Sequence, residues 1–174
     1  MDEFELTYLP KELPAGLAQA QAKEMLDIYI PASLEHPYLR IRKSGSVYEI
    51  TNKRPAVAGD SSHQIEHTIS LSEEEYNDLS IVPGKRVVKT RYLYLENGRL
   101  YEVDVFKGDL EGLVLVDVEF NSSGEKAAFV PPHWIGPEVT QEKFLAGGML
   151  CGKKYSDISL MLEPLGFKPL SVIS

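Results

Sequence analysis

Cysteine and long apolar runs are almost absent from this sequence. Cys151 is the single cysteine among 174 residues. It excludes an internal disulfide and is typical of a small buried hydrophobic residue in a reducing compartment. No apolar run reaches membrane-spanning length, and the start, MDEFELTYLP, has neither the basic region nor the apolar core of a secretion signal. We therefore expect a soluble, cytoplasmic protein.

Positive charge is also scarce. The chain has 18 Lys and Arg against 26 Asp and Glu, a formal net charge of -8. Non-specific nucleic-acid binding and binding to anionic membranes both depend on basic surface, so we expect neither partner. Any anionic ligand would need a local basic site. No phosphate-loop or dinucleotide-binding glycine motif is present, and the four histidines have no metal-ligand spacing.

What the sequence does contain is short runs of alternating apolar and polar residues. Without a repeat or linker to divide it, the chain fits a single domain, residues 1–174. Turn residues at Ser44-Gly45, Asn97-Gly98 and 121–124 separate several runs and favour antiparallel pairing. Eight runs are candidate strands: EFEL, DIYIP, YLRIRK, VYEITNK, QIEHTIS, RVVKTRYLYL, RLYEVDVF and LVLVDVEF.

Helical signals are fewer. Ser72 with Glu75 forms a capping box before a short helix, and SDISLMLE near the end predicts another. Residues 15–25 have high helix propensity, and Thr140 could cap a helix that ends at Gly147-Gly148. These helices are too few to cover both faces of a parallel sheet.

Charged residues recur at strand period, because like-charged pairs stand two residues apart on five of the candidate strands. The pairs are Glu3 and Glu5, Arg40 and Arg42, Lys89 and Arg91, Glu102 and Asp104, and Asp117 and Glu119. Lys53 and Glu66 fit the same faces as single charges. Each pair thus shares one face of its strand, opposite an apolar face.

Two architectures fit this pattern. One is a sandwich with a solvated charged face, which suits each pair taken alone. The other is a closed barrel with the charged face inward and the apolar face covered by helices. Here each of these five strands carries a pair of charges of one sign, whereas a surface selected only for solubility usually mixes positive and negative residues. We therefore predict an α+β fold, an eight-stranded antiparallel closed barrel with a few helices outside. A barrel that carries an apolar ligand is disfavoured because the inward parity is charged.

Such an interior needs water, ions and a ligand, since burying this many unpaired charges would exceed the net stability of a domain. Arginine and lysine donors suit phosphate oxygens. Carboxylates are the hard oxygen ligands that Mg²⁺ and Mn²⁺ prefer. A polyphosphate together with a divalent metal ion satisfies both sets of charges.

The ordered motifs resemble those of the CYTH, or triphosphate tunnel metalloenzyme, superfamily. EFELT matches the glutamates of the family's opening Glu-x-Glu-x-Lys signature at Glu3 and Glu5. LRIR, TNK, KTRY, EVDVFKGDLEGLVLVDVEF and WIGPEVT follow in the family's order and approximate spacing. The resemblance implies an antiparallel tunnel that binds a triphosphate-containing small molecule with one or two divalent cations, and we expect a monomer or homodimer.

Residue roles follow from this resemblance. It implies phosphate binding by Arg40, Arg42, Lys53, Lys89 and Arg91, and metal binding by Glu3, Glu5, Glu66, Asp104, Asp117 and Glu119. Asp117 and Glu119 would hold the attacking water. Tyr29 stands where some tripolyphosphatases have a tyrosine that works with the signature lysine, although it could equally be a packing residue. The implied reaction is metal-dependent hydrolysis of a triphosphate, most simply inorganic tripolyphosphate.

The sequence departs from the family pattern at three places. Thr7 replaces the signature lysine, Gln64 stands where many members have a glutamate, and QEKFLAGG lacks the family's Asp-x-x-Tyr-x-Asn pattern. These departures keep open a catalytically impaired module that binds triphosphate or polyphosphate. A triphosphatase for an organic triphosphate, nucleoside or thiamine, is the other alternative. Lys153 or Lys154 could replace the lost charge, or both could be solvated.

Overall fold

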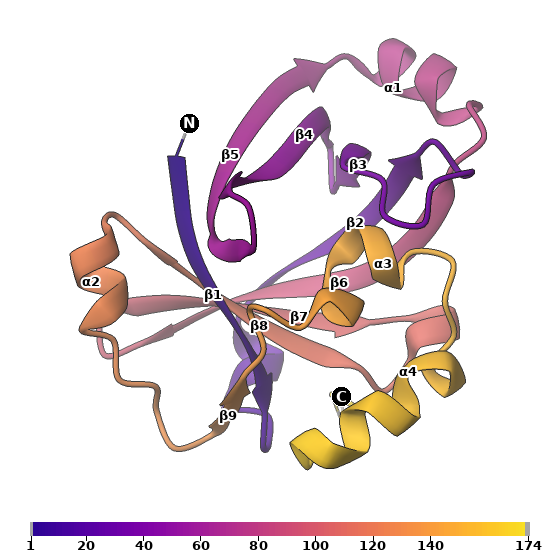
Figure 1. Cartoon of the computed structure of the whole chain (residues 1–174). Coiled ribbons are helices and arrows are strands. Elements are labelled where there is room, and N and C mark those ends of the chain that lie inside the picture. The colour runs from indigo at the N-terminus through magenta and orange to yellow at the C-terminus, as the bar shows by residue number, and fades with distance from the viewer. Residues whose placement is uncertain (1, 173–174) are drawn as a thin grey trace.

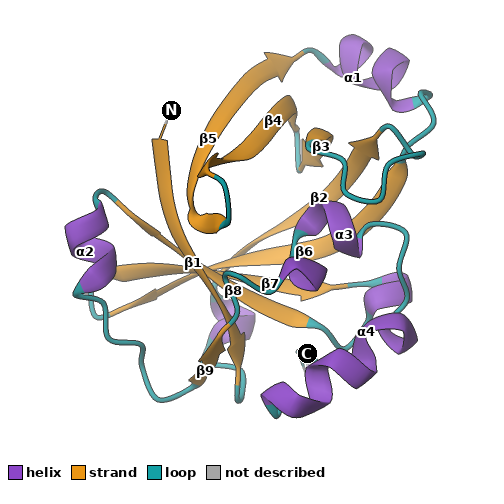
Figure 2. Ribbon diagram, in the orientation of Figure 1, coloured by secondary structure: helices purple, strands orange, loops and turns teal. Residues whose placement is uncertain are grey.

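The computed structural model describes residues 2–172, which fold around one curved sheet (Figures 1 and 2). The strands of that sheet are β1 (Asp2–Pro10), β2 (Gln21–Ile30), β3 (Leu39–Ser44), β4 (Val47–Val57), β5 (Asp60–Leu71), β6 (Lys85–Glu96), β7 (Arg99–Phe106), β8 (Val114–Phe120) and β9 (Ile135–Glu138). The α-helices are α1 (Glu73–Ser80), α2 (Ser123–Ala127), α3 (Gly147–Leu150) and α4 (Tyr155–Leu162). Short 3-10 turns are η1 (Leu17–Gln19), η2 (Gly108–Leu110), η3 (Lys143–Leu145) and η4 (Glu163–Leu165).

The sheet closes into a barrel. Its strand order is β5-β4-β3-β2-β6-β7-β8-β1-β9, and β1 also pairs with β5, so the first eight strands form a ring. Every pairing is antiparallel. The predicted eight-stranded antiparallel barrel with helices outside is therefore confirmed. The short strand β9, which the sequence analysis did not predict, pairs with β1 outside the ring.

The apolar faces of the strands point outward and are covered in part by the rest of the chain, while side chains such as that of Ile69 stay exposed. One core lies between the barrel wall and the C-terminal segment, where Leu150, Ile158 and Leu162 are almost fully buried. A second surrounds Trp134, and a third places Tyr76 of α1 against β2 and β3. None of the helices within the described residues is both long and apolar enough to cross a membrane.

Local signals explain several joints. Asn97 and Gly98 have φ values of 51° and 77°, the left-handed pair that a two-residue hairpin turn requires, and they join β6 to β7. The capping box at Ser72 and Glu75 is present, and α1 begins at Glu73. The helix predicted near SDISLMLE is α4. These predictions are confirmed.

Other local predictions are wrong. Within the segment 15–25, residues 21–25 form the start of β2 instead of a helix, because they pair with β6 and this tertiary pairing outweighs helix propensity. Thr140 caps no helix; its hydroxyl accepts a hydrogen bond from the backbone N–H of Thr7, and η3 and α3 follow separately. The turn expected at 121–124 opens α2, with Ser122 as its N-cap.

Candidate active site

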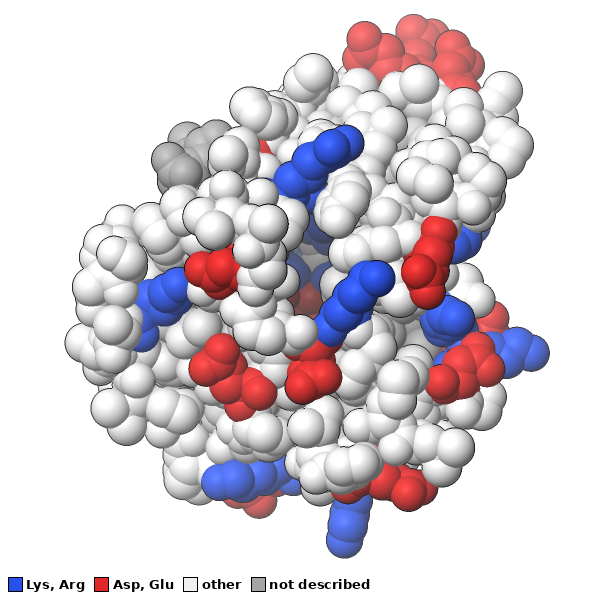
Figure 3. Space-filling view, viewed as in Figure 1, with Lys and Arg blue, Asp and Glu red and all other residues white. Residues whose placement is uncertain are grey.

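The barrel encloses a cavity of about 350 Å³. Figure 3 shows it as a hollow near the middle of the face, with charged atoms at its floor. The residues that the sequence analysis assigned to catalysis, phosphate binding or metal binding all line this one cavity, although their chemical roles remain predictions. They are Tyr29, Arg40, Arg42, Lys53, Lys89, Arg91, Glu3, Glu5, Glu66, Asp104, Asp117 and Glu119. Lys153 and Lys154, considered as replacements for the lost lysine, are exposed and do not line it.

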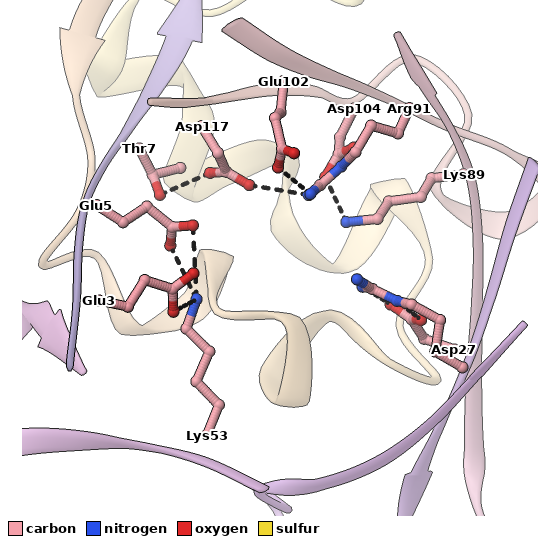
Figure 4. Close-up of polar contacts among 11 residues, drawn as sticks. Glu3, Glu5, Thr7, Asp27, Lys53, Lys89, Arg91, Glu102, Asp104 and Asp117 are labelled. Carbon is pink, nitrogen blue, oxygen red and sulfur yellow. Dashed lines mark hydrogen bonds and ion pairs between the residues drawn. The ribbon is translucent and has the colours of Figure 1, made fainter. Parts of the chain in front are cut away.

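Three carboxylates from two neighbouring strands meet on one wall. Glu5 on β1 lies opposite Glu119 on β8 in the antiparallel register, and Glu3 lies two residues earlier on β1. One carboxylate oxygen of each lies within 4.8 Å of the others, close enough to share a metal ion. Lys53 reaches across from β4, with its Nζ 2.7 Å from Glu3 and 3.3 Å from Glu5 (Figure 4). One ammonium group therefore offsets only part of the negative charge.

Burial and the excess negative charge raise the pKa values of two carboxyl groups on this wall. Burial, reinforced by the charges of Glu102, Glu3 and Glu5, raises the pKa of Glu119 to about 7. Burial and the charge of Glu5 raise the pKa of Asp117 to about 6. A divalent cation among these oxygens would relieve the repulsion, and carboxylate oxygens are its preferred ligands. The donor set thus fits the metal ion that the tunnel family implies.

Asp104 has a different environment. Its side chain is only 2% exposed, and its two oxygens accept hydrogen bonds from Lys89 and Arg91. Arg91 also contacts Asp117 and Glu102, so one guanidinium joins three carboxylates (Figure 4). Burial raises the pKa of Asp104, but Arg91 and Lys89 outweigh this effect and hold it well below its usual range. Asp104 acts here as the counterion of two cations.

Arg40 has a buried donor that could bind an anion. Its buried Nε has no hydrogen-bond partner among the described residues, and burying such a donor without a partner is costly. Tyr29 on β2 is 8% exposed and lies close enough to Arg40 to interact with it electrostatically, and burial raises the pKa of its hydroxyl. A phosphate oxygen is the kind of acceptor that an orphaned guanidinium donor requires.

All three departures from the family pattern lie at the cavity, since Glu142 and other residues of the QEKFLAGG segment line it beside Thr7 and Gln64. Thr7 faces it as strand parity predicts, and its hydroxyl donates a hydrogen bond to Asp117 Oδ1 at 2.9 Å. Gln64 lines it as well, with its amide donating to the backbone carbonyl of Ser61 at 3.1 Å. The position of the signature lysine is thus filled by a neutral hydrogen-bond donor.

Sequence reasoning missed Asp27. Its carboxylate is 1% exposed and accepts from Arg42 Nε at 2.6 Å and from Arg42 Nη2 at 2.7 Å. Burial raises its pKa, but the charge and hydrogen bonds of Arg42 outweigh this and lower the pKa to about 2. The available signal was parity, since Asp27 stands two residues before Tyr29 on one strand. Asp27 lies behind the lining residue Arg42, whereas Glu49, Thr51 and Thr68 line the cavity themselves and were not predicted.

Comparisons with known proteins agree with this geometry. The model of the CYTH domain matches residues 2–131. An inorganic triphosphatase of Nitrosomonas europaea is 37% identical over 145 residues, 82% of this chain and 92% of that protein. An inorganic triphosphatase of Acetivibrio thermocellus is 38% identical over 79 residues, 44% of this chain and 49% of that protein. A crystal structure of an inorganic triphosphatase superposes with a TM-score of 0.61 at 32% identity, covering 86% of this chain and 93% of that one. The chain belongs to the CYTH domain family.

Proposed function

We propose that this protein is a divalent-metal-dependent triphosphatase whose substrate is inorganic tripolyphosphate. The names of two relatives support this reaction. The observation that carries it is the arrangement of charge in one cavity. A cluster of carboxylates on β1 and β8 lies apart from the orphaned guanidinium donor of Arg40 on β3. A polyphosphate that bridges the two sides would satisfy both.

The phosphate chain lies along the basic residues. Arg40 Nε donates a hydrogen bond to one phosphate oxygen. Arg42 donates to Asp27 through Nε and Nη2, so its Nη1 donates to another phosphate oxygen. Lys89 and Arg91 keep their partner Asp104 and add further donors to the cavity. Positioning and charge neutralisation of this kind are most of what phosphoryl transfer asks of a protein.

Mg²⁺ or Mn²⁺ would be held by Glu3, Glu5 and Glu119, with Glu66 as a further oxygen donor along the same cavity. Such an ion supplies neutralisation of phosphate oxygens and a lowered pKa for a water molecule. Asp104 is left out of this assignment because Lys89 and Arg91 occupy its oxygens.

Asp117 and Glu119 orient the attacking water from the carboxylate wall. A carboxylate of this wall that is not bound to the metal ion, such as Asp117, accepts the proton that this water loses as it attacks the terminal phosphorus in line. The hydroxyl of Tyr29, beside Arg40, donates a hydrogen bond to the phosphate chain. The leaving group departs as the remaining diphosphate, stabilised by the same arginine donors.

Phosphate release from a substrate panel tests this proposal. We expect release from tripolyphosphate to exceed release from thiamine triphosphate and ATP, and Glu119→Ala to lower it by orders of magnitude. The matched control is Glu111→Ala, an exposed glutamate outside the cavity. Preference for an organic triphosphate would replace the proposed substrate, and equal rates in the two variants would remove Glu119 from the mechanism.

A binding module without turnover is the second candidate, favoured by the neutral Thr7 at the signature lysine position. Calorimetry separates the two functions. Micromolar binding of tripolyphosphate without any product in Mg²⁺ or Mn²⁺ supports the module and contradicts the enzyme. Absence of both binding and a triphosphate-dependent rise in melting temperature contradicts both.

We further place the protein in the cytoplasm. Cys151 is 2% exposed, and burial raises the pKa of its thiol to about 11. A buried, protonated thiol suits a reducing compartment. We expect no nucleic-acid or membrane partner, in accord with the acidic composition. We also expect a monomer or homodimer, because the residues of one chain line the cavity.

A further inference from the structure

Asp27 is a buried carboxylate that the reaction described above does not use; it does not line the cavity itself but is paired with Arg42, which does. It lies on β2, directly opposite Arg42 of β3 in the antiparallel register. Both of its oxygens accept from Arg42, a side-on pair in which the Nε–Nη2 edge of the guanidinium is fixed. In the close-up of Figure 4, Asp27 lies across the open space from the carboxylates of β1 and β8.

The charge of Asp27 extends beyond its partner. Arg40, Arg42 and Lys89 all act electrostatically on this carboxylate. Lys89 and Arg91 are already paired with Asp104, and Lys53 with Glu3 and Glu5. Asp27 therefore does for Arg42 what these carboxylates do for the other cations: it offsets the charge that the Arg42 guanidinium would otherwise present in full to a phosphate chain.

This pairing has two physical consequences. A buried arginine held by two short hydrogen bonds keeps one orientation before a ligand arrives, which lowers the entropic cost of binding. A fixed negative charge near the phosphate subsites also weakens their attraction for any polyanion, product included. An enzyme gains from both, because turnover requires a substrate that is well placed and a product that can leave.

We propose that Asp27 is a positioning residue that orients Arg42 toward the phosphate chain and limits the affinity of the basic side for polyphosphate, so that the product is released. This inference rests on the proposed triphosphatase function. It concerns affinity, however, and is measured separately from turnover.

Asp27→Asn tests the inference because an amide keeps the size and one acceptor for Arg42 but loses the charge. Calorimetry with a chelator present would measure binding of tripolyphosphate and of pyrophosphate. We expect both to bind about tenfold more tightly than to the parent, from the loss of one nearby negative charge. In turnover, KM and kcat should both fall, since tighter product binding slows release.

The matched control is Glu24→Gln, which also neutralises an ion-paired carboxylate on β2. Glu24 pairs with Lys107, which lies outside the cavity lining, whereas the partner of Asp27 is the lining residue Arg42, so polyphosphate affinity should be unchanged in Glu24→Gln. A purely structural role for Asp27 predicts lower stability with unchanged or weaker binding, and that result would overturn the inference. Equal tightening in Glu24→Gln would overturn it too, because the effect would then be one of net charge.

A second pair of variants covers the case in which Asp27→Asn does not fold. Arg42→Gln with Asp27→Asn replaces the ion pair by two amides, a change that buried pairs often tolerate. We expect it to bind tripolyphosphate about tenfold more tightly than Arg42→Gln alone, and no tightening would refute the inference. If the parent binds tripolyphosphate without hydrolysing it while Asp27→Asn still tightens binding, the proposed function fails and the role of Asp27 in affinity stands.

Discussion

Thr7 shows how one neutral residue changes the charge of the tunnel wall. Its hydroxyl donates to Asp117 Oδ1, and its backbone N–H donates to Thr140, so the side chain is held facing the cavity. A hydroxyl offers one donor and no charge, whereas an ammonium offers three donors and a positive charge. Within residues 2–172, the acidic wall formed by Glu3, Glu5 and Glu119 therefore has one cationic partner, Lys53, in an ion pair with Glu3 and Glu5.

Restoring a cation at this position should strengthen substrate binding. We predict that Thr7→Lys tightens tripolyphosphate binding about five- to thirty-fold, because a charge-assisted hydrogen bond is roughly twice as strong as a neutral one. Turnover should also rise if Tyr29 works with a lysine here. Affinity and rate are measured beside Thr7→Val, which removes the hydroxyl and adds no charge. No change in either quantity would mean that the side chain at position 7 does not reach the phosphates.

The Asp27–Arg42 pair also makes a prediction about acid stability. The pKa of Asp27 is about 2 in the folded protein against an ordinary value of 3.8. A carboxyl group whose pKa is lower in the folded protein stabilises the fold when the pH is above its pKa in the unfolded chain. That stabilisation is lost as the pH falls toward its pKa in the folded protein. We expect the pair to contribute about 2 kcal/mol at neutral pH, an order-of-magnitude figure from the linkage relation.

Denaturant unfolding of the parent and of Asp27→Asn between about pH 6 and pH 2 measures this contribution. The difference in unfolding free energy between the two should be largest above about pH 4 and should shrink as pH falls toward 2. The exposed Asp109→Asn serves as the control and should track the parent. A difference between parent and Asp27→Asn that stays constant over the whole range would contradict the linkage.

At the scale of elements, α3 closes one rim of the tunnel over Tyr29. A Cβ placed on Gly147 would lie 2.1 Å from the Tyr29 hydroxyl oxygen and 3.1 Å from its Cζ. Tyr29 is itself buried between β2 and the C-terminal core, so its ring has little room to retreat. The start of α3 therefore depends on a residue without a side chain.

We predict that Gly147→Ala destabilises the fold by about 1–3 kcal/mol, the usual cost of overpacking. Thermal unfolding measures it beside Gly124→Ala, where an added Cβ would meet only Ser122 Oγ at 3.9 Å. Combining Gly147→Ala with Tyr29→Phe should recover part of the loss, since the phenylalanine lacks the clashing oxygen. Equal melting temperatures for Gly147→Ala and Gly124→Ala would show that α3 does not pack on Tyr29 in this way.

Elements with strong local signals were predictable from the sequence. The alternating charges of LVLVDVEF identified β8 and the inward direction of Asp117, and the capping box at Ser72 identified α1. Segment 21–25 was not predictable, because its helix propensity is overruled by pairing with β6, a partner more than 60 residues away. The strand β9 has four residues and no alternation that local pattern could reveal.

At the scale of the whole molecule, alternation and sign segregation predicted a closed barrel and the residues that line it. Which cation pairs with which carboxylate could not be predicted, since that depends on the register between strands. Lys53 was expected to bind phosphate yet lies against Glu3 and Glu5, and Asp104 was expected to bind metal yet is held by Lys89 and Arg91. Their roles in the presence of ligand stay predictions.

The central claim is that the charged interior hydrolyses tripolyphosphate with the help of a divalent cation. Orthophosphate release from tripolyphosphate by the full-length protein, measured in Mg²⁺ or Mn²⁺ and again after chelation, tests it most directly. We predict release that requires the metal ion, returns when the ion is added back, and falls by orders of magnitude in Glu119→Ala. Release that persists after chelation, or no release at any metal concentration, would contradict the account.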